Sequence, residues 1–400
     1  MVESVLRAAI EEQAVERKAN LGMRRSALGA MPVQERFATI VTGIRRSGKS
    51  TLLNQWIESS GKRTTALLFD DLRTSTFEFD DFRILDKIIS DDKSEAVVLD
   101  EVQDVSGWEL FVNSLLNRGK LVLVTGSNAK MLSRELGTKL TGRHLDMEVF
   151  PFSYEEYVRF TGQERGDESF THYVKTGGFP AYVKTGLRQV LKDLFSDILY
   201  RDIIVRYGLS DTAPIKRLAT YLLGHVGCLL SPSRLKDAIR VQQSKTVLEY
   251  FDHLTECYLI HRLERFADAP KARMIAPKKI YGCDTGLIGA IENAQDANLG
   301  HKLENIVYWM LYRRGGDLTY FIAPDGSECD FLREAEDGAR EAVQVAWRLD
   351  DENRNREING LVKCLKRFGL KEGTIVTTTQ RDRAIQDGCE IQIVPAYDWE

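Results

Sequence analysis

The sequence has little of what marks secreted or membrane proteins. Only six of its 400 residues are cysteines, too few for a disulfide-stapled scaffold. No two of them form a CxxC pair, which argues against a zinc site. Its most apolar stretch outside the expected strands, residues 221–230, is far shorter than the roughly 20 residues of a membrane span. Residues 1–20 lack the apolar run of a signal peptide. We therefore expect a cytoplasmic protein with no membrane partner.

What remains is the composition of a globular chain with several domains. Hydrophobic residues make up 43% and charged residues 28%, enough to bury sizeable cores. The length predicts two or three domains. A net charge of −4 argues against a uniformly basic nucleic-acid coat. The charge is uneven, however, because residues 188–279 hold 16 Lys and Arg against 10 Asp and Glu.

The clearest motif is a glycine-rich loop between an apolar strand and a helical pattern. The strand expected at 37–42 (FATIVT) leads into GIRRSGKS at 43–50, which fits GxxxxGK[ST] in full. Backbone N–H groups of such a loop wrap phosphates, and the helix N-terminus favours their charge. We expect Lys49 to reach the β- and γ-phosphates of ATP, and Ser50 to bind Mg²⁺. The predicted nucleotide-binding residues are Gly43, Arg46, Ser47, Gly48, Lys49, Ser50 and Thr51. Arg45 and Arg46 could contact phosphate, pair with acids or face solvent.

A second element follows the expected strand at 96–99, which ends on Asp100-Glu101. This pattern is typical of a Walker B element, in which Asp100 holds the Mg²⁺ shell through water and Glu101 polarises the attacking water. The alternative is that the two acids cap a following turn. Because Glu101 is present, we expect hydrolysis of ATP as well as binding.

Two further catalytic positions are predicted beyond the strand at 121–124. Asn128 is expected to sense the γ-phosphate, with Ser127 or Thr125 as alternatives. Arg143, before a strand-like stretch at 145–150, is expected to stabilise transition-state charge in its own or a neighbouring subunit's site. A salt-bridged surface arginine is the equal alternative for Arg143.

The middle of the chain changes to helical patterns. Short helices at 154–160 and 170–175 predict a small lid, and GGFP at 177–180 predicts a turn with Pro180 starting a new helix. After a long helix at 189–207, three helices and a strand pair at 258–265 and 278–281 predict a winged helix–turn–helix. Its recognition helix would be residues 245–257, and its wing carries a basic cluster that could neutralise DNA phosphates. A purely structural role is the alternative. The cluster comprises Arg262, Arg265, Lys271, Arg273, Lys278 and Lys279.

Several strings together resemble the prokaryotic AAA+ ATPases of the archaeal-type, STAND-related group. They are GIRRSGKS, VVLDEVQ, VTGSNAKMLSRELGTKLTGRH, EVFPFSYEEYV, GGFP, YRDIIVRYG and KIYGCDTGL. The resemblance covers nearly the whole chain from about Phe37. It implies an ATPase core, a winged-helix module and a restriction-endonuclease-like domain, in that order. Members of such families often complete a site with a neighbour's arginine, so the resemblance also implies a homo-oligomer.

The last hundred residues resemble the PD-(D/E)xK nuclease fold in their α/β order. Glu304 fits the helix acid of that fold and Asp330 fits its aspartate. The third position is Gln344-Val-Ala346, where an amide replaces the acid and alanine replaces the lysine. Arg348 or Lys363 could substitute for the lysine. We expect a nuclease fold that does not cleave, because the metal-binding acids are incomplete and the cation is missing.

The sequence thus predicts an α/β protein with four parts. These are a P-loop ATPase core with a parallel sheet (1–150), a helical lid (151–190), a winged helix (191–290) and a nuclease-like domain (296–400). The leading hypothesis is an Mg²⁺-dependent ATP hydrolase that engages DNA through its C-terminal modules. The alternatives are a signalling NTPase that acts through protein–protein contacts and an ATP-gated nuclease.

Overall fold

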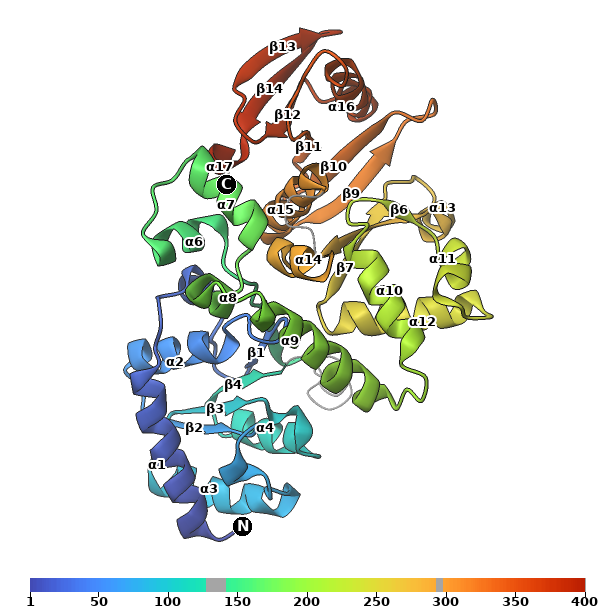
Figure 1. Cartoon of the computed structure of the whole chain (residues 1–400). Helices are drawn as coiled ribbons and strands as arrows, with labels where there is room; N and C mark the ends of the chain where they lie inside the picture. Colours follow the sequence, from blue (N-terminus) through green and yellow to red (C-terminus); the bar gives the residue numbers. More distant parts are fainter. Residues whose placement is uncertain (127–141, 293–297, 400) are drawn as a thin grey trace. The chain divides into compact units, whose positions relative to one another are not determined.

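The computed structural model describes residues 1–126, 142–292 and 298–399 (Figure 1). The chain divides into two compact units. Unit 1 comprises Met1–Pro151 with Glu256–Tyr258, and unit 2 comprises Phe152–Thr255 and Leu259–Glu400. The division at Pro151 lies one residue beyond the predicted end of the ATPase core. The predicted boundaries near residues 190 and 290 fall inside unit 2 and stay predictions.

Unit 1 is built on a five-stranded parallel sheet in the order β2-β3-β4-β1-β5. Its strands are β1 (Ala38–Thr42), β2 (Thr64–Leu68), β3 (Ala96–Asp100), β4 (Leu121–Thr125) and β5 (His144–Glu148). Its helices are α1 (Glu3–Ala19), α2 (Lys49–Ser60), α3 (Phe82–Asp91) and α4 (Trp108–Asn117), with short 3-10 turns η1 (Ser26–Ala30), η2 (Leu72–Thr74), η3 (Phe79–Asp81) and η4 (Val102–Asp104). All five strands occur where the sequence predicts strands, at 37–42, 66–69, 96–99, 121–124 and 145–150, within two residues at each end.

The hydrophobic runs of these strands follow from burial on both sheet faces. Every residue of β1 and β3 is buried, as expected for central strands of a parallel sheet. Side chains on one face pack with α2 around Leu52 and Leu53, and those on the other pack with α3 and α4 around Trp108. The sheet therefore fixes the carboxyl ends of β1, β3 and β4 at one edge, where the predicted site residues lie.

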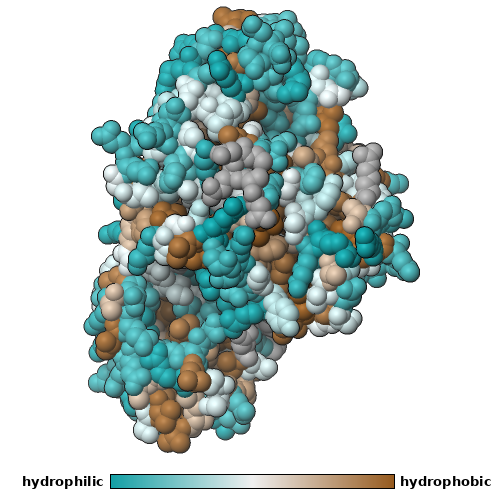
Figure 2. Space-filling model, in the orientation of Figure 1, coloured by the Kyte–Doolittle hydropathy of each residue, from teal (hydrophilic) through white to brown (hydrophobic). Residues whose placement is uncertain are grey.

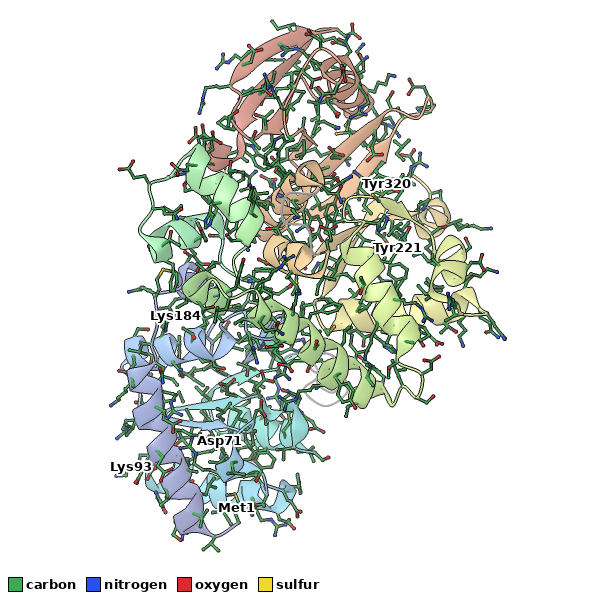
Figure 3. All side chains as sticks on the ribbon, in the orientation of Figure 1. Met1, Asp71, Lys93, Lys184, Tyr221 and Tyr320 are labelled. Atoms are coloured by element: carbon green, nitrogen blue, oxygen red, sulfur yellow. The ribbon has the colours of Figure 1, made fainter. Side chains whose placement is uncertain are left out.

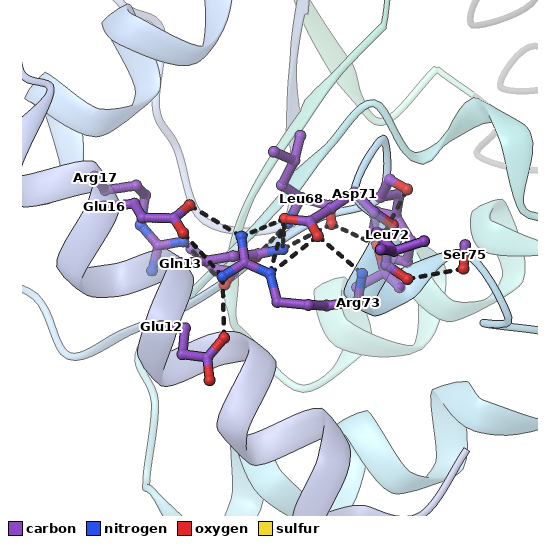
Figure 4. Close-up of polar contacts among 12 residues, drawn as sticks. Glu12, Gln13, Glu16, Arg17, Leu68, Asp71, Leu72, Arg73 and Ser75 are labelled. Carbon is purple, nitrogen blue, oxygen red and sulfur yellow. Dashed lines mark hydrogen bonds and ion pairs between the residues drawn. The ribbon is translucent and has the colours of Figure 1, made fainter.

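Helix α1 covers the open edge of the sheet beside β2 (Figure 4). The Gln13 amide donates to the carbonyl oxygen of Leu68 (3.1 Å) and accepts from its N–H (2.9 Å), so it replaces a neighbouring strand at that point. Arg73 binds Asp71 and, at 2.9 Å, Glu16 of α1. Arg73 also lowers the pKa of Asp71 to about 2. The edge strand is thus closed by side chains, which protects it from pairing with another chain.

The first half of unit 2 is mainly helical. Its elements are α6 (Tyr154–Thr161), α7 (Asp167–Thr176), α8 (Pro180–Thr185), α9 (Gln189–Asp197), a π-helix η5 (Ile198–Val205), α10 (Ala213–Leu223), β6 (Leu229–Leu230), α11 (Pro232–Ile239), α12 (Ser244–Glu256), β7 (Ile260–Arg265), α13 (Pro270–Ile275), β8 (Lys278–Gly282) and α14 (Thr285–Glu292). The long helix expected at 189–207 is present, but its second half has π geometry. The stretch between β7 and β8, expected as a loop, contains α13.

For the second half of unit 2 the sequence predicts the order helix, strand, strand, strand, helix, strand, strand. The structure has this order with two additional elements. Its elements are α15 (Leu299–Arg313), β9 (Asp317–Ile322), β10 (Glu328–Glu334), β11 (Arg340–Val345), α16 (Arg354–Phe368), β12 (Glu372–Thr377), β13 (Asp382–Gln386), β14 (Cys389–Pro395) and α17 (Ala396–Trp399). Strand β13 and helix α17 were not predicted. Exposed Arg383 and Ile385 obscure the alternation of β13, since its residues are mostly exposed.

A nine-stranded sheet runs through the regions predicted as winged helix and nuclease-like domain. Its order is β13-β14-β12-β11-β10-β9-β7-β8-β6, and β7 pairs with β9 in parallel through Glu264 and Arg265. The two predicted modules therefore share one sheet. Whether each half is a winged helix or a nuclease-like domain stays a prediction.

The GGFP string forms a turn, and Pro180 begins α8 as predicted. Gly177 has φ +66°, and a Cβ there would lie 2.2 Å from Oδ1 of Asp284. The Gly178 N–H donates to Oδ2 of Asp284 at 2.6 Å. GGFP and KIYGCDTGL, two of the strings that carry the family resemblance, thus meet at the buried carboxylate of Asp284. A side chain at Gly177 would collide with this carboxylate.

Hydrophilic residues cover most of the visible face of both units, with hydrophobic residues interspersed (Figure 2). Across the described ranges, the helices are all too short or too polar to cross a membrane.

The buried carboxylate of Asp284 predicts a pH dependence of stability. Burial raises its pKa to about 6, against the lowering effect of the N–H groups of Gly178, Leu287 and Gly286. Between the unfolded pKa of about 3.9 and the folded value, the folded state binds more protons, so this group's contribution to stability falls as pH rises through that window. The slope reaches up to about 1.4 kcal/mol per pH unit.

Urea unfolding of wild type and Asp284→Asn at pH 4.5, 5.5 and 7 measures this contribution. We expect the free energy of unfolding of the wild type to gain on that of the variant as pH falls. A difference that stays constant across the three pH values would contradict the assignment.

Candidate functional site

The glycine loop lies between β1 and α2, as the motif requires. Gly43 has φ +130°, and a Cβ there would lie 2.2 Å from the carbonyl oxygen of Val149. Gly48 has φ +102° and precedes the first residue of α2, Lys49. Only glycine adopts both conformations without strain, so the loop backbone can curl with its N–H groups at the helix N-terminus.

Lys49 lies in the mouth of this loop. Its side chain is 4% exposed, and Nζ donates to the carbonyl oxygens of Gly43 (3.0 Å) and Ile44 (3.2 Å). Nζ also lies 3.9 Å from a carboxylate oxygen of Glu101. Backbone carbonyls hold the ammonium only weakly compared with phosphate oxygens, so it is positioned to move onto a bound phosphate.

The two acids stand at the end of β3, where the hydroxyl of Thr125 joins them. Thr125 Oγ1 donates to Oδ1 of Asp100 and accepts the N–H of Glu101 at 2.9 Å. Burial raises the pKa of Asp100, and hydrogen bonds from Thr125 and Ser50 act in the opposite direction. A buried carboxylate of this kind is stabilised in its charged form by a nearby cation.

Glu101 is held in an unusual backbone conformation. Its φ of +57° is left-handed, and its side chain accepts from Nε2 of Gln103 at 2.6 Å. It occupies the position before η4 but makes no capping hydrogen bond through its side chain. The structure therefore does not support a capping role for Glu101. A left-handed conformation at a residue other than glycine is strained, and such strain is common at functional sites.

The residues present fit Mg²⁺. Ser50 and Asp100 supply the hard oxygen ligands that this ion prefers, and the Ser50 hydroxyl acts to lower the pKa of Asp100. Both residues also line a cavity of about 160 Å³, together with Glu16 and Arg17 of α1 and apolar side chains of α2, β2 and β3. Since Mg²⁺ keeps several of its water ligands, its coordination needs space beside the two oxygens.

The other predicted loop residues differ in their surroundings. Arg45 lies 3.9 Å from Asp70, which supports the pairing alternative for it. Arg46 is exposed at φ +62°. Ser47 is fully buried, with no hydrogen-bond partner for its hydroxyl among the described residues. Thr51 lies in the first turn of α2. Their roles in nucleotide binding stay predictions.

The predicted sensor and arginine finger receive no support from the geometry. Asn128 and Ser127 lie outside the described residues. Thr125, the other alternative, binds Asp100 and Glu101 and so positions the two acids. Arg143 is bound to Asn113 and, at 2.9 Å, to Asn117 of α4. Its guanidinium is thereby held on a helix of its own chain, and a role in catalysis or in an oligomer stays a prediction.

A second cluster lies in unit 2, around the buried ammonium of Lys279 on β8. Its Nζ is 2.5 Å from Glu328, 2.8 Å from Asp330 and 3.0 Å from Glu304. Tyr281 also donates to Glu304, at 2.7 Å. The ring of Tyr320 on β9, labelled in Figure 3, has its centroid 5.9 Å from Nζ. We call these residues, with Gln344, the Lys279 cluster.

This cluster brings together the three predicted nuclease-like residues. Gln344 accepts the N–H of Asp330 at 3.1 Å through its amide oxygen and donates to Glu357 at 2.6 Å. The cation beside Glu304 and Asp330 is Lys279, which the sequence placed among the DNA-contacting residues of the wing. That assignment is wrong for Lys279, because its side chain is 2% exposed. Of the two expected substitutes, Lys363 instead binds Asp325 and Ser327, and Arg348 is exposed.

The electrostatics of the Lys279 cluster keep the ammonium charged. Burial opposes the charge, but Asp330 and Glu304 raise the pKa of Lys279 well above that of an ordinary lysine. Burial also raises the pKa of Glu304 to about 7, although Lys279 acts to lower it. Among the described residues, no group of three His, Cys, Asp or Glu side chains is arranged to hold a metal ion. In the Lys279 cluster, an internal cation takes up the carboxylate oxygens.

Sequence reasoning missed the positions of Lys279 and of Arg25. Arg25 lies before η1, and its guanidinium binds the carbonyl oxygen of Ser47 in the glycine loop at 2.6 Å. Neither residue stands in a motif that identifies its partner, because each meets it across a long sequence separation. The only local signal for Lys279 was its place on a strand of apolar residues.

Comparison with known proteins adds a family match to this geometry. Residues 35–158 match the model of a family described as "AAA domain". Residues 167–298 match a domain of unknown function, DUF8612. The first match contains the glycine loop and both acids, so this part of the chain is similar to an AAA domain, and its parallel five-stranded sheet is consistent with a P-loop core.

Two relatives that match most of the chain are described as uncharacterized proteins. An uncharacterized protein of Haemophilus influenzae is 29% identical over 386 residues, which span 91% of this chain and 94% of the relative. The uncharacterized protein MJ1544 of Methanocaldococcus jannaschii is 27% identical over 390 residues, 90% of this chain and 87% of the relative.

Two solved structures show a distant likeness. The S. cerevisiae Hsp104:casein complex matches at 12% identity and a TM-score of 0.27, covering 62% of this chain and 40% of the Hsp104 complex chain. Drosophila ORC bound to AT-rich DNA and Cdc6 matches at 10% identity and a TM-score of 0.21, covering 72% and 93%.

The Lys279 cluster predicts a large loss of stability when the ammonium is removed. In Lys279→Met, the buried carboxylates of Glu304 and Asp330 and the partly exposed one of Glu328 lose their cation, and breaking a buried pair in this way costs about 3–5 kcal/mol. We expect this loss in chemical unfolding at pH 8 and a partial recovery at pH 5, because burial raises the pKa of Glu304 to about 7 and this carboxylate is then protonated.

Lys278→Met is the matched control. Lys278 is adjacent in sequence and pairs with Glu264 at the partly exposed end of the strand, so its loss is expected to cost no more than about 1 kcal/mol. Equal losses in the two variants would show that burial among carboxylates gives Lys279 no special role.

Proposed function

We propose that this protein hydrolyses ATP with Mg²⁺ and uses the nucleotide state as a switch. The observation that carries the proposal is the grouping of Lys49, Ser50, Asp100 and Glu101 at the carboxyl ends of β1 and β3. The match of residues 35–158 to an AAA domain supports it.

Each of these residues has a definite task in this mechanism. The loop N–H groups and Lys49 bind and orient the phosphates, and the low exposure of Lys49 strengthens its attraction for them. Ser50 and Asp100 would hold Mg²⁺, which neutralises charge on the phosphates when bound. Glu101 would accept a hydrogen bond from the attacking water, while Thr125 fixes its backbone.

The surroundings of the predicted recognition helix do not favour DNA as the partner. Helix α12 carries one lysine, Lys245, against Glu249, Asp252 and Glu256, and Lys245 itself lies 3.6 Å from Glu249. A helix with an excess of acids repels the phosphates on either side of a groove.

The basic cluster of the wing is also mostly neutralised. Arg273 and Lys278 share Glu264 at 2.6 and 3.1 Å, and Arg262 lies 3.0 Å from Asp252. Lys279 is buried, and Arg265 donates to a backbone carbonyl. Between β7 and β8, helix α13 instead exposes Met274 and Ile275, at 79% and 73%.

We therefore infer that unit 2 acts on a protein partner, the alternative of a signalling NTPase. Exposed apolar residues flanked by internally paired charges suit a protein surface better than a phosphate backbone. Cleavage of nucleic acid is disfavoured, because Lys279 occupies the oxygens of Glu304 and Asp330 that a metal would need.

The hydrolysis mechanism is tested by two substitutions. Lys49→Ala removes the phosphate-binding cation and should lower ATP turnover by at least about 100-fold. Glu101→Gln should retain MgATP binding but slow turnover to a similar degree, since the amide cannot polarise water as a carboxylate does. Phosphate release and fluorescent-nucleotide binding measure the two properties. Glu101→Gln with wild-type turnover would remove this residue from the mechanism.

The choice of partner is tested by turnover in the presence of nucleic acid. We expect single-stranded, duplex and forked DNA to leave the ATPase rate unchanged at about 50 mM salt, where phosphate contacts are strongest. Stimulation by any of these DNAs that weakens steeply with salt would favour the DNA hypothesis instead. In that case Lys271→Ala, which changes an exposed basic residue of α13, should reduce the stimulation.

A further inference from the structure

Arg25, the residue directly before η1, packs against the glycine loop. It is 5% exposed, and its Nη1 donates to the carbonyl oxygen of Ser47 at 2.6 Å. A Cβ on Gly48 would lie 2.5 Å from the same nitrogen. The guanidinium thus packs directly against the two residues that precede Lys49, and it contacts them from a segment that belongs to no motif.

The same guanidinium reaches the end of the core. Its Nη2 donates to the carbonyl oxygen of Phe150 at 2.8 Å, one residue before the last residue of the main segment of unit 1. One planar group therefore links the phosphate loop to the point at which the chain leaves the AAA-type core. Arg has the fork geometry for two such carbonyls, which a lysine ammonium on its flexible stem does not reproduce.

Helix α2 itself holds Arg25 in this place. The Gln55 side chain accepts the Arg25 N–H at 2.9 Å and donates to the carbonyl oxygens of Leu21 (2.8 Å) and Met23 (2.7 Å). Gln55 is 7% exposed and lies in the helix that begins at Lys49. Gln55 thus hydrogen-bonds segment 21–25 to the middle of α2. The guanidinium of Arg25 in turn binds the glycine loop at the start of that helix.

We propose that Arg25 is a positioning residue for the nucleotide site. It fixes the Ser47 and Gly48 backbone in the shape that presents N–H groups to phosphate, and it ties that shape to the exit of the core at Phe150. The inference rests on the proposed function, because it assumes that the loop binds nucleotide. The effect of Arg25 on the loop is measured by nucleotide binding alone, without hydrolysis. Because the guanidinium binds the backbone carbonyls of Ser47 and Phe150, we expect its removal to act through the loop backbone.

The test is MgADP affinity of Arg25→Ala, measured with a fluorescent ADP analogue on the full chain. We expect a loss of at least about tenfold, since charge-assisted hydrogen bonds to one buried and one partly buried carbonyl are removed. Guanidinium at low millimolar concentration should restore part of the affinity of Arg25→Ala and leave that of the wild type unchanged. Partial rescue is the readout that a general loss of fold would not give.

Three further variants complete the experiment. Arg24→Ala changes the exposed neighbouring arginine and should bind MgADP as the wild type does. Arg25→Lys should recover only a minor part of the affinity, because the ammonium cannot bridge both carbonyls. Gln55→Leu releases segment 21–25 without touching the guanidinium and should weaken binding in the same direction, so the test survives if Arg25→Ala does not fold.

The inference is overturned if folded Arg25→Ala binds MgADP with wild-type affinity, or if Arg24→Ala loses as much. It is also overturned if Arg25→Lys binds as tightly as the wild type. Failure of the proposed function gives a different result, namely a wild type that binds MgADP but does not hydrolyse ATP.

Discussion

The hydroxyl of Thr125 connects the ends of two neighbouring strands, and the site in unit 1 depends on that connection. Parallel pairing of β3 with β4 brings Thr125 beside Asp100 and Glu101. A hydroxyl can donate one hydrogen bond and accept others, so it orients a carboxylate and a backbone N–H at once. With both acids fixed, Lys49 stands 3.9 Å from Glu101 and the Ser50 hydroxyl acts to lower the pKa of Asp100, so the four side chains gather at the carboxyl ends of β1 and β3.

Two buried lysines show how partners decide the role of a residue type. Lys49 binds two backbone carbonyls of the glycine loop and lies 3.9 Å from the carboxylate of Glu101, and in the proposed function its charge meets phosphate. Lys279 binds three carboxylates, and its charge is satisfied within the chain. The first arrangement suits catalysis. The second ties β8 to α15 and β10, and it is the reason that a cluster with the acids of a nuclease-like site is not expected to take a metal.

The charges of unit 2 lead to the same distinction. A local excess of basic residues at 188–279 suggests nucleic acid when it is counted along the sequence. In the folded chain, acids from beyond residue 279 offset part of that excess, because Asp317 pairs with Arg273, and Glu304, Glu328 and Asp330 surround Lys279. The counted charge was correct, but the inference from it required knowing which acids lie opposite.

Local patterns carried most of what could be predicted. The strands of unit 1, the loop at Gly43–Ser50 and the turn before Pro180 follow from runs of neighbouring residues, and all are present. Lys279 and Arg25 could not be placed in the same way, because their partners are 22 to 125 residues distant. The π geometry of η5 and the short helix α13 were also missed, since neither has a periodicity that distinguishes it from an ordinary helix or loop.

The most direct test of the central claim is a single-turnover measurement with protein in excess over ATP. The account predicts that the wild type converts the bound ATP to ADP and phosphate when Mg²⁺ is present and leaves it intact when EDTA removes the ion. Recovery of unchanged ATP with Mg²⁺ present, from protein that demonstrably binds it, would contradict the account. So would conversion at the same rate in EDTA.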